Sequence, residues 1–269
     1  MDSGNQGVAF SLPEFRQRVL TETTVRTLQI EDEVGSTNTL AQQTSSLLES
    51  DQLPALFVTR RQTGGRGRGR NSWWFGEGAL AFTLLIEPSR WGIAAARWPT
   101  LSLAVGGAVA TVIDRWFPDK NIRLKWPNDV YFDGRKGCGI LNESVPQSAE
   151  RLVLGIGINV NNSFATAPEE VRQRGVSLMD LTGHECDIEQ LLLDILKQMD
   201  SDFTELAVGS PQLVDRWRRL CLLTGSIVTV EQGGSLQTGT CLGLEHDGAL
   251  RLQTAAGPQR LYSGMVIEF

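Results

Sequence analysis

The chain has 269 residues, carries a formal net charge of −6 and is 41% hydrophobic. This length can bury a full core in one large or two unequal domains, and the acidic balance argues against a dedicated nucleic-acid binder built on a basic domain. The four cysteines lack C-x-x-C spacing and the two histidines lie far apart, so we expect reduced thiols and no metal site built by protein side chains.

The amino-terminal segment is mostly polar and lacks the positive region and apolar core of a signal peptide. No stretch of about 18 uninterrupted apolar residues follows, so we expect a cytoplasmic protein without a membrane span. Hydrophobic periodicity predicts an irregular alternation of helices and strands over the first 223 residues. The expected helices cover 13–20, 39–49 (with Ser36, Thr37 or Asn38 as its N-cap), 101–117, 188–203 and 211–223. The expected strands cover 56–59, 79–87, 122–125, 130–132, 139–143 and 152–160.

The pattern changes after Gly225, where short strands follow one another closely between Gly-Gly, Asp-Gly, Gly-Pro and Ser-Gly turns. These strands are expected at 227–231, 240–244, 249–253, 260–262 and 266–269. Short, closely spaced strands with such turns are typical of a small barrel. We therefore predict an α+β protein with a first domain of residues 1–223 and a small barrel of residues 224–269.

The loop at residues 60–70 reads RRQTGGRGRGR and concentrates five arginines and four glycines in an otherwise acidic chain. Glycine lets a backbone approach a ligand closely, and arginine offers forked donors to phosphate or carboxylate. No lysine follows a glycine, which excludes a Walker A loop. The loop stands alone between two predicted strands, which favours a small anionic ligand over an RNA-binding segment or a flexible linker. We expect it to be mobile when empty and closed over its ligand.

Three further motifs place polar residues at strand ends. In KWPND, the proline extends the residue before it, so Lys125 and Asp129 bracket a tight strand connection. Lys136 follows an Asp-Gly turn and precedes two glycines, which makes it a candidate point charge for a carboxylate or phosphate. GIGINVN lacks the third glycine of a dinucleotide fingerprint and leaves Asn159 as a buried or ligand-facing amide. Taken singly, each motif is also compatible with a structural turn.

Together and in this order, the motifs resemble those of biotin protein ligases, also called biotin–[acetyl-CoA-carboxylase] ligases. The matching segments are Ser36-Thr37-Asn38, Gln62 to Arg70, Lys125 to Asp129, Lys136-x-x-Gly139-Ile140-Leu141-x-Glu143 and Gly155-x-Gly-x-Asn159. The resemblance implies a mixed-sheet catalytic domain of the biotin/lipoate ligase type, similar to class II synthetases, with a C-terminal SH3-like barrel. It also implies activation of biotin with MgATP to biotinyl-5′-AMP, and transfer of biotin to a lysine of a biotin carboxyl carrier domain of acetyl-CoA carboxylase.

The resemblance also assigns roles to matching residues. Lys136, Arg68 and Asp129 are the implied catalytic residues: the two cations offset charge where a carboxylate meets a phosphate, and Asp129 orients the acceptor amine. The implied biotin-binding residues are Ser36, Thr37, Asn38, Gln62, Gly65, Arg66, Gly67, Arg68, Lys136 and Gly139. The implied nucleotide-binding residues are Arg66, Trp73, Lys125, Asn128 and Asn159. ATP with Mg²⁺ and biotin are substrates in this interpretation.

The chain departs from the family pattern in two places. Many members carry an arginine one position after Arg70, so Arg70 has no assigned contact. The segment before Gly35 is too short for the winged-helix domain of repressor-type members, so we expect a ligase that binds no operator or other nucleic acid. The resemblance also allows a homodimer through an exposed strand. Lipoate–protein ligase and a non-enzymatic RNA-binding module are the alternative functions.

Overall fold

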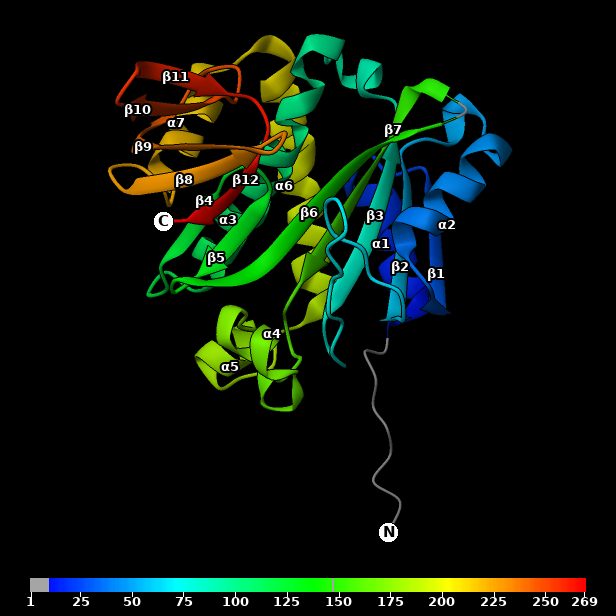
Figure 1. Ribbon diagram of the computed structural model, residues 1–269. Helices are drawn as coiled ribbons and strands as arrows, with labels where there is room; N and C mark the ends of the chain where they lie inside the picture. Colours follow the sequence, from blue (N-terminus) through cyan, green and yellow to red (C-terminus); the bar gives the residue numbers. More distant parts are fainter. Residues whose placement is uncertain (1–9, 147) are drawn as a thin grey trace.

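The computed structural model describes residues 10–146 and 148–269, and its centre is a seven-stranded mixed sheet (Figure 1). The strand order is β1-β2-β3-β7-β6-β5-β4. β1 and β2 are parallel, and every other neighbouring pair is antiparallel. The strands are β1 (Thr27–Val34), β2 (Ala55–Gln62), β3 (Leu80–Ile86), β4 (Ile122–Lys125), β5 (Asp129–Phe132), β6 (Arg135–Val145) and β7 (Ser148–Ile158).

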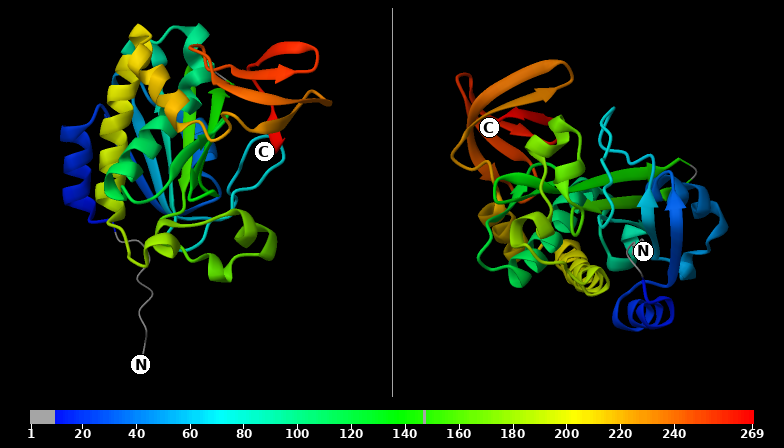
Figure 2. Two further views of the ribbon diagram at one scale, coloured as in Figure 1. Left: turned by 90° about the vertical axis from the view of Figure 1, so that its left-hand side faces the viewer. Right: turned by 90° about the horizontal axis from the view of Figure 1, so that it is seen from below.

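Helices cover both faces of this sheet. They are α1 (Leu12–Glu22), α2 (Thr37–Thr44), α3 (Leu101–Trp116), α4 (Glu169–Arg174), α5 (Leu178–Thr182), α6 (Ile188–Val208) and α7 (Pro211–Leu220). The long helices α3 and α6 lie on one face, and the loop that follows β2 crosses the other (Figure 2). Alternation along β2 explains the two layers: Leu56 and Val58 join the large core with α3 and α6, whereas Phe57 packs with Ala41 of α2.

One segment, Ala95–Trp116, is long and apolar enough by composition to cross a membrane, yet 67% of its most apolar stretch is buried inside the fold. This segment contains α3. Gly106 and Gly107 let the helix approach its neighbours, because an added Cβ would lie 2.9 Å from Leu124 and 3.2 Å from Trp217. The apolar composition of α3 therefore matches its position in the core.

The C-terminal residues form a separate antiparallel sheet of five strands in the order β11-β10-β9-β8-β12. The strands are β8 (Ile227–Gln232), β9 (Ser235–Leu244), β10 (Leu250–Thr254), β11 (Gly257–Leu261) and β12 (Met265–Glu268). The sheet is consistent with an SH3-like barrel, but its ladder does not close between β11 and β12. It lies at the β4 and β5 side of the central sheet (Figure 1), where Trp126 Nε1 donates to the Gly248 carbonyl at 3.1 Å.

The α+β class, the mixed sheet and all five C-terminal strands are confirmed, and the four cysteines are free thiols. The expected helix at 39–49 is wrong in its bounds, because α2 begins at Thr37 and gives way at Ser45 to a 3-10 turn. Ser36 occupies the N-cap position of α2. The sequence pattern predicts no strand at β1, an edge strand whose residues 31–33 are all acidic, and it misses the short helices α4 and α5.

Candidate active site

A cavity of about 660 Å³ lies between the central sheet, the edge of the C-terminal sheet and the segment 63–73 that follows β2. We call this segment the Arg/Gly loop; residues 60–62 of the loop expected from the sequence belong to β2. It brings together most of the residues that the sequence analysis singled out. From the predicted set it is lined by Ser36, Thr37, Asn38, Gln62, Arg66, Gly67, Arg68, Trp73, Lys125, Asn128, Asp129, Lys136 and Gly139. Motifs that are up to about a hundred positions apart thus face one space.

One end of the cavity is a buried polar pocket at the N-terminus of α2. Ser36, Thr37 and Asn38 are each at most 8% exposed. The Thr37 amide donates to Gln62 Oε1 at 3.0 Å, and the Thr83 hydroxyl donates to Asn38 Oδ1 at 2.7 Å. Buried polar groups with fixed partners suit recognition of a neutral ring that carries both donors and acceptors.

Three glycines make room for the side chains above them. An added Cβ at Gly155 would lie 1.9 Å from Asn38 Oδ1, and one at Gly157 would lie 2.6 Å from the Trp73 ring. Gly139 pairs with Gly157 across β6 and β7 and also lies beneath Trp73. Alternate residues of a strand share a face, so Gly155 and Gly157 both lie on the cavity side of β7. Without a Cβ, they leave room there for the Asn38 and Trp73 side chains.

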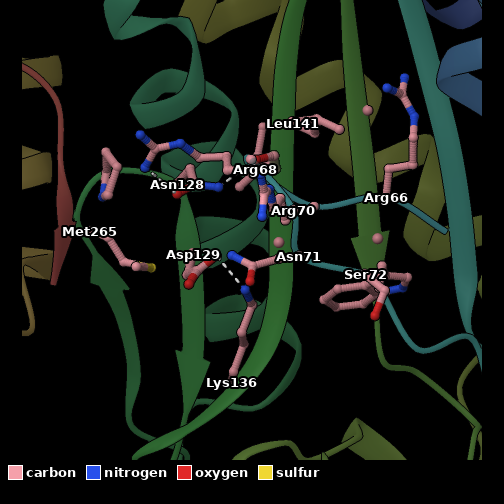
Figure 3. Close-up of a pocket in the computed structure, with 18 of the residues that line it drawn as sticks. Arg66, Arg68, Arg70, Asn71, Ser72, Asn128, Asp129, Lys136, Leu141 and Met265 are labelled. Atoms are coloured by element: carbon pink, nitrogen blue, oxygen red, sulfur yellow. Dashed lines mark hydrogen bonds and ion pairs between the residues drawn. The ribbon is translucent and has the colours of Figure 1, made fainter. Parts of the chain in front are cut away.

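The opposite end of the cavity carries positive charge around one carboxylate. Lys136 Nζ lies 2.7 Å from Asp129 Oδ1, and Arg68 points toward the same region (Figure 3). Burial lowers the pKa of Lys125, and the nearby Lys136 lowers it further, while Asp129 opposes both effects. Among the described residues no cluster of three or more metal-ligating side chains occurs. An anionic ligand would therefore meet lysine and arginine here.

The Arg/Gly loop is folded back on itself over the sheet. The Gly67 amide donates to the Asn71 carbonyl at 2.8 Å, and the Trp73 amide donates to the Gly65 carbonyl at 2.9 Å. Gly69 has a φ of 64°, which lies in the left-handed region that favours glycine. Arg70 lines the cavity, but its side chain forms no hydrogen bond or ion pair with the described residues.

The C-terminal sheet contributes to the cavity, which the sequence analysis did not anticipate. Arg68 Nη1 donates to the Gly264 carbonyl at 3.0 Å and to Asn128 Oδ1 at 3.4 Å. Lys125 Nζ donates to the Val266 carbonyl at 3.5 Å and lies 4.3 Å from the centre of the Phe269 ring. These are mostly backbone carbonyls, so no residue type in the sequence marked them.

Two predicted ligand residues do not reach the cavity. Gly65 packs against the Trp73 carbonyl, where an added Cβ would lie 2.5 Å away. Asn159 is 3% exposed, and its amide Nδ2 donates to the Lys136 carbonyl at 3.4 Å. Asn159 therefore joins the end of β7 to the backbone beside a cavity lysine, and direct ligand contact by either residue stays a prediction.

Comparison with known proteins agrees with this geometry. Residues 32–161 match the biotin/lipoate A/B protein ligase family, and residues 224–267 match the biotin protein ligase C terminal domain. A biotin--[acetyl-CoA-carboxylase] ligase of Mycobacterium tuberculosis is 32% identical over 247 residues, which cover 90% of this chain and 89% of the relative. The chain belongs to the biotin protein ligase family.

Structural similarity to other biotin protein ligases extends over both sheets. The Aquifex aeolicus enzyme, solved in complex with biotin and ATP, superposes with a TM-score of 0.76 at 30% identity, covering 90% of this chain and 97% of that one. A bifunctional ligase/repressor BirA of Bacillus spizizenii is 28% identical over 256 residues, which cover 93% of this chain and 76% of the relative. The family resemblance inferred from the motifs is thereby confirmed.

Proposed function

We propose that this protein activates biotin with MgATP to biotinyl-5′-AMP and then transfers biotin to a lysine of a biotin carboxyl carrier domain. The observation that carries the proposal is the single cavity that joins a buried polar pocket to a cluster of cations. Biotin has a neutral ring system at one end and a carboxylate at the other, which matches the two ends of the cavity. The relative with bound biotin and ATP supports the same assignment.

In the first step, a biotin carboxylate oxygen forms a bond to the α-phosphorus of ATP, and the bond to pyrophosphate breaks. Two anions must approach each other, so fixed positive groups lower the barrier. Lys136 and Arg68 are proposed for this role because each projects a cationic side chain into the cavity (Figure 3). Trp73, Lys125 and Asn128 are proposed to hold the nucleotide.

In the second step, the amine of the acceptor lysine attacks the acyl carbon, an amide bond forms, and AMP leaves. The attacking amine must lose its protons along the way. Asp129 is proposed to orient the amine and accept a proton, because its carboxylate is 18% exposed at the cavity surface. Asp129, proposed to contact the acceptor amine, also forms an ion pair with Lys136, proposed to contact the acyl phosphate.

The proposal is tested by incubating the purified chain with MgATP, either biotin or lipoate, and both biotin- and lipoate-acceptor domains. Intact mass spectrometry should show a biotin adduct on the carrier domain and none without ATP, together with pyrophosphate release. Incorporation of lipoate alone would replace the proposal with lipoate–protein ligase. Absence of pyrophosphate release, with RNA binding that weakens steeply as salt rises, would favour the RNA-binding alternative.

The finer assignments belong to the same proposal. We place the domain boundary at residues 223 and 224, in keeping with the separate C-terminal sheet and the family match that begins at residue 224. The carrier of acetyl-CoA carboxylase is the proposed acceptor, in a cytoplasmic setting. The net charge of −6 supports a ligase that binds no operator, and sequence-specific, salt-sensitive binding of duplex DNA would contradict this. The edge strand β1 is the proposed contact of a homodimer, which analytical ultracentrifugation would test.

A further inference from the structure

Glu143, near the end of β6, forms a bidentate ion pair with Arg66 of the Arg/Gly loop. Arg66 Nη2 lies 2.7 Å from Glu143 Oε2, and Nη1 lies 3.1 Å from Oε1. The side chains are 42% and 25% exposed, so the pair is half-buried at the edge of the cavity. Two parallel charge-assisted hydrogen bonds fix the guanidinium in one plane and one direction.

The same carboxylate also reaches the buried polar pocket. Asn38 Nδ2 donates to Glu143 Oε2 at 2.8 Å, and Asn38 Oδ1 accepts from the Thr83 hydroxyl, which also lies 2.9 Å from Thr37 Oγ1. A continuous set of polar contacts therefore runs from the loop to the pocket. Its members, in order, are Arg66, Glu143, Asn38, Thr83, Thr37 and Gln62.

Arg66 and Arg68 differ in what they contact. Arg68 turns toward Asn128 and the C-terminal sheet, at the end of the cavity that holds Lys136 and Asp129, whereas Arg66 extends away from that end (Figure 3). Two N–H groups of the Arg66 guanidinium already donate hydrogen bonds to the Glu143 carboxylate. It is therefore poorly placed to serve as a second clamp on phosphate.

We propose that Glu143 is a positioning residue, and that Arg66 acts through it as a brace that ties the Arg/Gly loop to the ring-binding pocket. Contact of a ligand with Thr37 and Asn38 holds Asn38 in place, Asn38 helps to hold the Glu143 carboxylate, and Glu143 holds Arg66 and the loop. The identity of that ligand as biotin rests on the proposed function. The brace itself rests on contacts within the chain.

The test is a double-mutant cycle with Glu143→Gln, Arg66→Met and the combined variant, with Glu33→Gln as matched control. Glu33 pairs with Arg61 at 3.0 Å, so this control removes an equally charged partner from an exposed ion pair outside the cavity lining. Backbone amide exchange of residues 63–73 is measured without ligand, and thermal unfolding reports on the global fold. Biotin affinity is then measured by calorimetry for the same set.

Loss of the brace should speed amide exchange at Gly67 and Trp73 about fivefold in Glu143→Gln, the fold-change equivalent to ~1 kcal/mol for a partly exposed ion pair. Arg66→Met should do the same, and the double variant should be no faster than either single variant. Biotin affinity should fall by a similar factor. Exchange that is no faster than in Glu33→Gln, or additive effects in the double variant, would overturn the brace. A parent protein that binds no biotin would instead overturn the proposed function, since exchange is measured without ligand.

Discussion

Replacement of Lys136 by methionine separates a chemical role from a structural one. Methionine keeps the length and apolar stem of the side chain but removes the ammonium that lies 2.7 Å from Asp129 Oδ1. If Lys136 offsets the charge where biotin carboxylate meets phosphate, adenylation should fall far more than stability does. If Lys136 were only a surface lysine in a structural hairpin, its replacement would lower the adenylation rate and the stability by comparable free energies.

The structure sets the size of the two effects. The ion pair is partly exposed, with 34% of the Lys136 side chain and 18% of the Asp129 side chain accessible, so its loss should lower the free energy of unfolding by only about 1 kcal/mol. Lys136 Nζ also lies 5.8 Å from the centre of the Trp73 ring, a contact worth roughly 0.5–1 kcal/mol at an exposed site. Removal of a preorganised charge at a reacting centre typically costs about 100- to 1,000-fold in rate, or roughly 3–4 kcal/mol.

Single-turnover pyrophosphate release with saturating biotin and MgATP measures the first step, and urea unfolding measures stability. Lys120→Met is the matched control, because Lys120 pairs with Asp119 at 3.0 Å outside the cavity lining and its loss should leave adenylation unchanged. A Lys136→Met enzyme that retains more than a tenth of the parental rate would refute the proposed charge role. Equal free-energy losses in rate and unfolding would refute it as well.

Three other predictions test separate features. Arg68→Met, which loses the contact with the Gly264 carbonyl, should release biotinyl-5′-AMP about tenfold faster in a trapping assay, and unchanged release would remove Arg68 as the clamp. Gly155→Ala should weaken biotin binding at least tenfold by calorimetry, because the new methyl would overlap the Asn38 amide. Unchanged affinity would contradict the conclusion that this position must be glycine to make room for Asn38. Burial raises the pKa of Asp202 to about 6 despite its ion pair with Arg216, so the folded state binds this proton more tightly than the unfolded chain does. The stability that this proton provides is fully present below about pH 4 and is lost as pH rises through about 6. Urea unfolding across this range should show the decline in the free energy of unfolding. Asp202→Asn should remove the part of the decline that is due to Asp202.

The sequence alone predicted which residue types would form the site and most of the residues that line the cavity. Arginine, lysine and glycine have few substitutes where a backbone and fixed cations must meet an anion, so the Arg/Gly loop, KWPND and the Lys136 motif were recognisable without coordinates. Alternating and helical periodicity also encode which residues of an element face the core, which is why most strands of the central sheet and the five short C-terminal strands were predicted. The mixed character of the central sheet was implied only by the family resemblance.

The tertiary structure decided which distant segments share the cavity. Glu143 contacts Arg66 because β6, antiparallel to β7, extends to the part of the sheet that lies beside the loop. The two residues are 77 positions apart in the sequence, and hydrophobic periodicity cannot predict a contact at that separation. The C-terminal sheet reaches Arg68 through the Gly264 carbonyl, a backbone group that every residue possesses. The type of a side chain indicates its chemistry in the sequence, whereas backbone groups and pairs of distant residues acquire their roles only when the chain folds.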